Sequence, residues 1–273
     1  MISRFKFLAG LLFDIGTIPI QIINTLLLIP IFISKYDSIL FGNWISILSL
    51  ITFFLFFDMG FGLPFTNEIK NGAKNNFITS VILLTILLSI LASISFYFTH
   101  NFIFNFFKID EISKKTSILI SIYLFLEIAI GSFGCILNGK GHIDIANKFK
   151  MLGEFIYLLV FAVSILFDQG INSFIFALIS KTFFVGLILF YYSKVKFNLF
   201  RLTLKIISAS EIKFFLKDLF KYQTHRINET IYQSADNLII QYFIGPSSVT
   251  IYNLTSKLAV LFTRSLAPKI TST

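Results

Sequence analysis

Long apolar segments alternate with short polar stretches along the whole chain, and eight of the segments are long enough to cross a lipid bilayer, which takes about 20 apolar residues. The predicted spans are residues 7–33, 39–57, 77–98, 116–137, 149–167, 171–192, 214–243 and 247–269. Only three residues separate the fifth span from the sixth, so we expect these two to form a tight antiparallel hairpin. The stretch from His100 to Lys115 mixes phenylalanine with charged residues and is predicted to be a short amphipathic helix on the membrane surface.

The first predicted span carries four polar residues at helical spacing. They are separated by three, four and three positions, which places them on one face of a helix: Asp14, Thr17, Gln21 and Asn24. This row is either the wall of a hydrated cavity or a set of groups that hydrogen bond between packed helices. Four polar groups in one row favour the cavity.

The seventh predicted span has a longer polar face. Its members keep a spacing of three or four residues: Asp218, Lys221, His225, Glu229, Gln233 and Asp236. Such a helix either spans the membrane with this face on water or lies on the membrane surface. A surface helix usually has a polar face rich in Lys and Arg, whereas this face is nearly balanced in charge, which favours a spanning helix.

Composition places the chain among integral membrane proteins of the all-α class, because 56% of its residues are hydrophobic and only 14% are charged, against about a quarter in soluble proteins. The formal charge of +9 is unevenly distributed. With the N-terminus inside, twelve Lys and Arg residues fall in cytoplasmic loops and four in outer loops, namely Lys35, Lys108, Lys114 and Lys115. This bias predicts a cytoplasmic N-terminus and contact of the protein with the lipid bilayer and its anionic lipids, and gives no support to binding of nucleic acid.

The sequence contains no recognisable motif of an enzyme or a metal site. The single cysteine, Cys135, lies in an apolar segment, and the three histidines are too scattered to complete a metal site. We therefore predict no enzymatic step, no cofactor and no metal. Two charged residues inside predicted spans, Glu127 and Lys257, are each either part of a polar passage or one half of a structural ion pair.

Four stretches, in order along the chain, resemble bacterial polysaccharide flippases of the multidrug, oligosaccharidyl-lipid and polysaccharide exporter superfamily. "FGNW" (41–44) is similar to the Gly-x-Trp/Tyr pattern that introduces the second helix of this family, and "FFDMGFGLPFTNEIKNG" (56–72) resembles the loop that follows it. "LNGKGHIDIANKF" (137–149) is similar to the loop between the fourth and fifth helices, with Asn147 where the family often carries an asparagine. "SADNLIIQYFIGPSSVTIYNLTSKLAVL" (234–261) resembles the start of the second lobe through Asp236, Ile239, Ile240, Gly245 and Tyr252.

The resemblance implies a fold with a six-helix first lobe (residues 1–192), a basic cytoplasmic linker (193–213) and the first two helices of a second lobe (214–273). Members of the family usually have twelve to fourteen helices in two pseudo-symmetric lobes around a central cavity. Since this chain ends after the eighth predicted helix, we expect it to be part of a longer protein or to associate with another chain.

The resemblance also implies a function. The protein would flip a polyprenyl pyrophosphate that carries an oligosaccharide repeat unit from the cytoplasmic to the outer leaflet by alternating access, for a surface polysaccharide such as O-antigen or capsule. It would lie in the bacterial inner membrane, with a polysaccharide polymerase and chain-length proteins as partners. Two other functions stay open: a cation-coupled exporter of small amphiphiles, and a non-transporting scaffold of envelope polysaccharide assembly.

Within such a transporter, the polar residues of the spans have three expected roles. Residues expected to contact substrate are Lys221, Arg226, Lys257, Gln21 and Asn24. Carboxylates expected to couple an ion or to pair with these bases are Asp14, Glu127, Glu229 and Asp236. Residues expected to form a gating cytoplasmic turn are Asp58, Gly60 and Gly62.

Overall fold

A computed structural model describes residues 4–58, 60–109, 112–197, 223, 227–228, 231 and 234–257. Every regular element in this part of the chain is a helix, and six helical stretches are long and apolar enough to cross a membrane. They are Ile15–Tyr36, Ser38–Lys70, Asn75–Phe106, Lys114–Gly139, Ile143–Leu166 and Asn172–Lys196. The first six predicted spans are therefore confirmed, whereas much of the seventh and the eighth lies outside the described residues.

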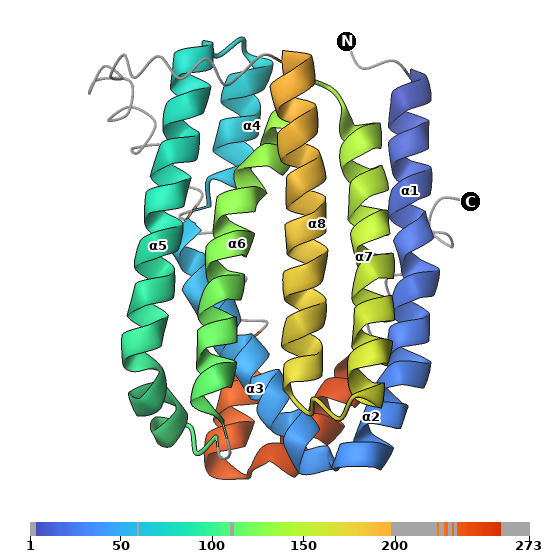
Figure 1. Ribbon diagram of the computed structural model, residues 1–273, viewed down its shortest axis with the longest axis vertical. Helices are drawn as coiled ribbons and strands as arrows, with labels where there is room; N and C mark the ends of the chain where they lie inside the picture. The colour runs from blue at the N-terminus through green and yellow to red at the C-terminus, as the bar shows by residue number, and fades with distance from the viewer. Residues whose placement is uncertain are drawn as a thin grey trace.

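Five long helices stand side by side in the order α5, α6, α8, α7 and α1 (Figure 1). Their bounds are Arg4–Ile23 for α1, Asn75–Phe106 for α5, Lys114–Gly139 for α6, Ile143–Leu166 for α7 and Asn172–Phe197 for α8. Helices α5 to α8 alternate in direction. The turns at residues 71–74 and 140–142 and the end of α8 therefore share one end of the bundle with the start of α1.

This end of the bundle carries most of the described Lys and Arg residues, and we call it the basic end. Its members are Arg4, Lys6, Lys70, Lys74, Lys140, Lys148, Lys150, Lys194 and Lys196. The opposite end, which we call the outer end, carries Lys35, Lys108, Lys114 and Lys115. The uneven charge seen in the sequence thus corresponds to two distinct ends of the folded bundle.

The first span is one bent helix in three parts: α1, the π-helical turn Asn24–Leu28 and α2 (Ile29–Tyr36). Pro19 lies inside α1 and Pro30 in the first turn of α2, and neither residue has an N–H to bond to the preceding turn. The wider π-helical turn lies directly before Pro30. Turns of this type occur frequently at functional sites.

The helix of the second span contains a break, and a further short helix follows it where the sequence predicted a loop. Helix α3 (Ser38–Phe54) continues through a 3₁₀ turn (Leu55–Asp58) into the short helix α4 (Gly62–Lys70). Gly60 has a φ of 66°, a left-handed conformation that interrupts the helix, and its N–H donates to the Asp58 carboxylate at 2.8 Å. The break therefore lies inside a membrane span, and the turn that follows the span comes at residues 71–74.

Helix α5 is longer than predicted. Its 32 residues measure about 48 Å at 1.5 Å per residue, which exceeds the hydrocarbon core of about 30 Å. The stretch from His100 to Phe106, predicted to belong to a separate surface helix, instead continues α5. The physical reason is that no Gly or Pro interrupts α5, and that Phe96, His100 and Phe104, four residues apart, share one buried face.

Aromatic side chains fill the outer half of the bundle. The ring of Phe174 in α8 packs against Phe161 in α7, Trp44 in α3 and Phe32 in α2, with ring centroids 4.3, 4.8 and 4.7 Å apart. All four side chains are buried, and such ring pairs add to the stabilisation by burial. A second apolar core around Phe65 joins α4 to α5 and α6.

Residues 234–243 and 246–257 form two short helical stretches that pack against the outer half of α3 (Figure 1). The turn between them contains Gly245, whose φ is 118°. Gly42 of α3 lies so close to Pro246 that a Cβ atom there would come within 1.9 Å of the Pro246 carbonyl oxygen. Close docking of these two stretches therefore requires glycine at position 42.

A polar clamp joins two loops at the outer end. The ammonium of Lys35 lies 2.6 Å from the Asp168 carboxylate and also donates to the Ile165 carbonyl at 2.7 Å. The hydrogen bond and the positive charge of Lys35 lower the pKa of Asp168 from its ordinary value. The clamp connects the end of α2 to the turn between α7 and α8.

Candidate functional site

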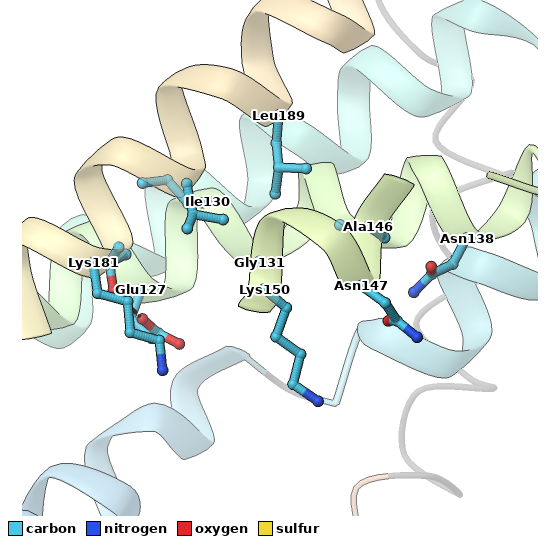
Figure 2. A pocket seen from close by; sticks show the side chains of 12 residues that line it. Glu127, Ile130, Gly131, Asn138, Ala146, Asn147, Lys150, Lys181 and Leu189 are labelled. Carbon is cyan, nitrogen blue, oxygen red and sulfur yellow. Dashed lines mark hydrogen bonds between the residues drawn. The ribbon is translucent and has the colours of Figure 1, made fainter. Parts of the chain in front are cut away.

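A cavity of about 260 Å³ lies between α6, α7 and α8, and we call it the groove (Figure 2). Half of its twelve lining residues are polar or charged. The lining consists of Glu127, Ile130, Gly131, Gly134 and Asn138 of α6, Ala146, Asn147 and Lys150 of α7, and Lys181, Thr182, Val185 and Leu189 of α8. Polar and ionisable side chains are costly inside membrane spans, so their concentration here marks the groove as the candidate site.

The inner end of the groove holds charged groups from three helices. The ammonium of Lys181 in α8 lies 2.6 Å from the Glu154 carboxylate in α7, and both residues are half-buried. The hydroxyl of Thr182, the next residue in α8, donates to the Glu127 carboxylate of α6 at 2.7 Å. Adjacent residues of α8 therefore bind two carboxylates on two different helices.

Two tyrosines and an amide surround this charged group. The Tyr123 hydroxyl, one helical turn before Glu127, lies beside the Glu127 carboxylate, and Tyr157 lies one turn beyond Glu154. The side chain of Asn24, in the π-helical turn of the first span, faces the Tyr157 hydroxyl. Four of the six spans in the described part of the chain thus contribute polar groups to one internal cluster.

The other end of the groove points toward the basic end of the bundle. Figure 2 shows Asn147 and Asn138 at this end, Lys181 beside Glu127 at the inner end, and Lys150 between them. The amide of Asn147 donates to the Gly10 carbonyl of α1 at 2.9 Å, so this asparagine holds α1 against α7. Lys150 places a positive charge on the path of a ligand that enters the groove from the basic end.

The wall of the groove on α6 contains two glycines that no packing contact explains. A Cβ atom at Gly131 or Gly134 would meet no other atom within 4 Å. Elsewhere on the same helix Gly139 is packed so tightly that a Cβ would lie 2.7 Å from Ile69. Glycine inside a helix costs up to about 1 kcal/mol relative to alanine, so the two bare positions preserve open space.

A separate polar network lies at the outer end, between α3 and residues 234–243. The Ser46 hydroxyl donates to Gln241 Oε1 at 3.0 Å, and the Gln241 amide donates to Asn43 Oδ1 at 3.3 Å and to the Lys108 carbonyl at 3.2 Å. The Asn237 amide donates to the Ser49 hydroxyl at 3.1 Å. These five side chains are all buried, and we call them the amide network.

The structure brings together only part of the predicted set of site residues. Glu127 lines the groove and Asn24 belongs to the cluster behind it, whereas Gln21 is exposed. Asp236 is exposed and accepts a hydrogen bond from the Tyr252 hydroxyl at 2.6 Å. Lys257 is half-buried at the end of the described helix.

Other predicted residues cannot be assigned an environment. Lys221, Arg226 and Glu229 lie outside the described residues, and of Asp14 only the backbone, in α1, is described. Asp58, Gly60 and Gly62, predicted to form a gating cytoplasmic turn, lie at the turn between the 3₁₀ turn and α4. Their role in gating stays a prediction.

Several residues of the site were not predicted from the sequence: Glu154, Thr182, Tyr123, Tyr157 and Asn138. Glu154 was missed because the fifth span was predicted to start at residue 149, which would leave this carboxylate near the membrane surface. The helix in fact starts at Ile143, so Glu154 lies three turns inside it. Lys181 in the neighbouring span was the available signal, since a buried carboxylate and ammonium require a partner.

A bundle of membrane-spanning helices with a polar groove in its interior defines a multi-pass helical membrane protein. Within the described residues no three His, Cys, Asp or Glu side chains are grouped to hold a metal ion. The chain belongs to the family of polysaccharide biosynthesis proteins, which it matches over residues 10–273. This match confirms the family predicted from the four sequence stretches. No curated protein and no solved structure matches the chain at a significant level.

Proposed function

We propose that this protein flips polyprenyl-pyrophosphate-linked oligosaccharides across the bacterial cytoplasmic membrane during synthesis of a surface polysaccharide. The observation that carries the proposal is the polar groove inside a membrane-spanning bundle, in a chain of a polysaccharide biosynthesis family. A sugar head is rich in hydroxyl groups and cannot cross the hydrocarbon core unaided. A groove lined by amides, charges and bare backbone offers such a head hydrogen bonds while the lipid tail stays in the bilayer.

The two halves of the bundle differ in a way that suits alternating access. Excess Lys and Arg mark the basic end as cytoplasmic, so substrate would enter the groove past Lys150. At the outer end the aromatic core and the amide network hold the elements together. A further hollow of about 580 Å³ lies on the outer stretches and is lined by residues between 240 and 256. In this proposal the described arrangement admits substrate from the cytoplasm, and transport requires the outer end to open.

The second lobe would complete the passage. In this proposal residues 1–192 form the first lobe, 193–213 the basic linker and 214–273 the start of the second lobe. Lys221, Arg226 and Lys257 would contact the pyrophosphate or an acidic sugar, because Lys and Arg suit phosphate in charge and geometry. A polysaccharide polymerase and chain-length proteins would receive the flipped substrate.

Purified protein in lipid vesicles tests the proposed function. The probe is the polyprenyl-pyrophosphate-linked oligosaccharide isolated from cells that make the protein, and a membrane-impermeant reagent reports the sugar that reaches the outer leaflet. Protein should accelerate this transfer relative to empty vesicles and to vesicles that contain a heat-inactivated sample. No acceleration would overturn the proposal: export of a cationic amphiphile instead would identify an amphiphile exporter, and no transport of either probe would favour a scaffold.

A further inference from the structure

We propose that the inner end of the groove is a binding site for one uncharged sugar ring, and that Glu127 accepts hydrogen bonds there from two neighbouring hydroxyl groups of the ring. The inference rests on the proposed function only where it takes this ring to be part of the transported substrate. The site itself follows from the side chains of the groove. It adds the kind of sugar that the groove selects, because acidic and amino sugars fit the same groups less well.

The carboxylate of Glu127 has acceptor positions left for a ligand. Its side chain lines the groove, and the Thr182 hydroxyl donates to its Oε2 atom at 2.7 Å. The hydroxyl of Tyr123, one helical turn earlier, is a second hydrogen-bond partner. A carboxylate can accept about four hydrogen bonds, so about two positions remain. Two adjacent hydroxyl groups of a sugar ring can donate to the two oxygen atoms of one carboxylate.

The ammonium of Lys181 supplies donors at the same end of the groove (Figure 2). It has three N–H groups, and one of them donates to the Glu154 carboxylate at 2.6 Å. This ion pair balances the charge of Lys181 inside the bundle. The inner end therefore offers acceptor positions on Glu127 and donor positions on Lys181 side by side.

A hydroxyl group matches this arrangement, because it can donate one hydrogen bond and accept another. A hydroxyl of a bound ring can donate to Glu127 while it accepts from Lys181. The carboxylate of an acidic sugar only accepts, and it would lie beside the like charge of Glu127. The ammonium of an amino sugar only donates, and it would leave the N–H groups of Lys181 without an acceptor. An unpaired polar group away from water is costly, so an uncharged ring is favoured.

The backbone of α6 leaves room for such a ring beside Glu127. Gly131 lies four residues after Glu127 and therefore on the same face of the helix. A Cβ atom at Gly131 would meet no other atom within 4 Å. The groove of about 260 Å³ is slightly smaller than the pockets of about 300–1,000 Å³ that hold drug-sized ligands. Its inner end therefore suits one sugar ring and not a whole repeat unit.

Saturation-transfer NMR on the purified full chain tests the site with free sugars, so the result does not depend on transport. The protein is kept in a polyoxyethylene detergent, because a sugar-based detergent would compete for the groove. The probes are the methyl glycosides of glucose, galactose and mannose. Each is compared with its uronic acid and with the derivative that carries an ammonium at the same carbon. The uncharged form of the best-bound sugar should bind about tenfold more tightly than either charged form.

Substitution of Glu127 separates a role in specificity from a structural role. Glu127→Gln removes the negative charge and keeps the size of the side chain. The uncharged glycoside should then bind about tenfold more weakly, whereas the uronic acid, which is no longer repelled, should bind at least as tightly as before. Damage to the fold would weaken all forms alike. Glu68→Gln, which changes a carboxylate of α4 outside the groove lining, is the matched control and should leave every dissociation constant unchanged.

A second variant tests the space and not the charge. Gly131→Val fills the room beside Glu127, so the uncharged glycoside should bind more weakly although the carboxylate is intact. The thermal unfolding temperature of the variant should stay close to that of the unaltered protein, because no neighbouring atom opposes the new Cβ atom. Unchanged binding by this variant would show that the ring does not lie against α6 and would contradict the site.

Three further results would overturn the sugar site. They are no binding of any uncharged glycoside, a charged form that binds the unaltered protein at least as tightly, and an unchanged ratio between charged and uncharged forms in Glu127→Gln. The vesicle assay separates this failure from failure of the proposed function. Protein that flips the lipid-linked oligosaccharide but gives one of these results would refute the sugar site alone. Protein that prefers uncharged glycosides but flips no lipid-linked oligosaccharide would refute transport and retain the site.

Discussion

Gly131 and Gly134 leave the part of α6 that lines the groove without side chains. Substitutions at these two positions therefore test whether the groove must stay open. Gly134→Val should reduce transport, because two methyl groups would project into the groove from a Cβ that meets no atom within 4 Å. A loss of about 1.4 kcal/mol in the free energy of substrate binding corresponds to a tenfold weaker affinity, which lowers the rate when substrate is below saturation. The vesicle assay measures the rate, and the thermal unfolding temperature of the purified variant measures its stability.

The matched control lies five residues away on the same helix. Gly139→Ala should lower the unfolding temperature, because its Cβ would collide with Ile69 at the α4 contact, whereas Gly134→Ala should leave it unchanged or slightly higher. If Gly134→Val loses stability as Gly139→Ala does, position 134 serves packing and the groove has no open wall there. Equal transport by Gly134→Val and the unaltered protein would show that substrate does not pass α6.

At the residue scale the sequence predicted single polar groups better than their partners. Glu127 stands in the middle of an apolar span, so it was recognised as a site residue. Its partner Thr182 was not, because a threonine in a membrane helix usually bonds to its own backbone, as Thr52 does. Only the approach of α6 to α8 brings the Thr182 hydroxyl to the carboxylate, and such pairing between helices is not encoded in spacing along one helix.

At the scale of whole elements, the amide network decides how residues 234–257 are held. Gln241 makes three hydrogen bonds, and buried hydrogen bonds between membrane helices contribute about 0.6 kcal/mol each on average. Gln241→Leu should therefore weaken the outer contact by roughly 2 kcal/mol. In protein with Cys135→Ser, the pair Ser46→Cys and Gln241→Cys should be joined by a short bifunctional methanethiosulfonate reagent, which forms a disulfide with each cysteine and replaces the reach of the Gln241 side chain. This cross-link should stop transport.

A cysteine pair at the exposed positions Leu63 and Phe243 is the control, since these lie on α4 and on the outer stretch respectively and should not cross-link within one molecule. Full transport by the cross-linked pair 46–241 would show that the outer contact never opens, and would contradict alternating access at this end. Restoration of transport after reduction would confirm that the disulfide itself is responsible.

The helices were predicted well where apolar length and hydropathy determine them. They were predicted poorly where local backbone geometry determines the residue at which a helix starts or breaks. Six spans follow from apolar length alone. The break at Gly60 was mistaken for the end of a span, because a glycine with positive φ interrupts a helix as fully as a loop does. The early start of α7 at Ile143 was missed because its first two turns are polar on the side that faces the groove and α1.

At the scale of the whole molecule, the outer half is packed with aromatic rings and the half toward the basic end contains the groove. Because of this asymmetry, polar residues with the same helical spacing have different surroundings in the two halves of the bundle. The amide network joins elements through buried hydrogen bonds. The groove instead has charged groups at its inner end, two asparagines at the other, and a lysine and two glycines between them.

The asymmetry predicts which positions water can reach from each side of the membrane. In cells that produce protein with Cys135→Ser, a cysteine at Asn138 should react with an impermeant maleimide only from the cytoplasmic side, because Asn138 lines the groove near the basic end. A cysteine at Ser49, buried in the amide network, should react from neither side, and one at Asp168, an exposed outer turn, should react only from outside. Reaction at position 138 from outside would reverse the orientation assigned by the positive residues. Reaction at position 49 from outside in resting protein would show that the outer end is open, and the alternating-access scheme would then have to start from the opposite state.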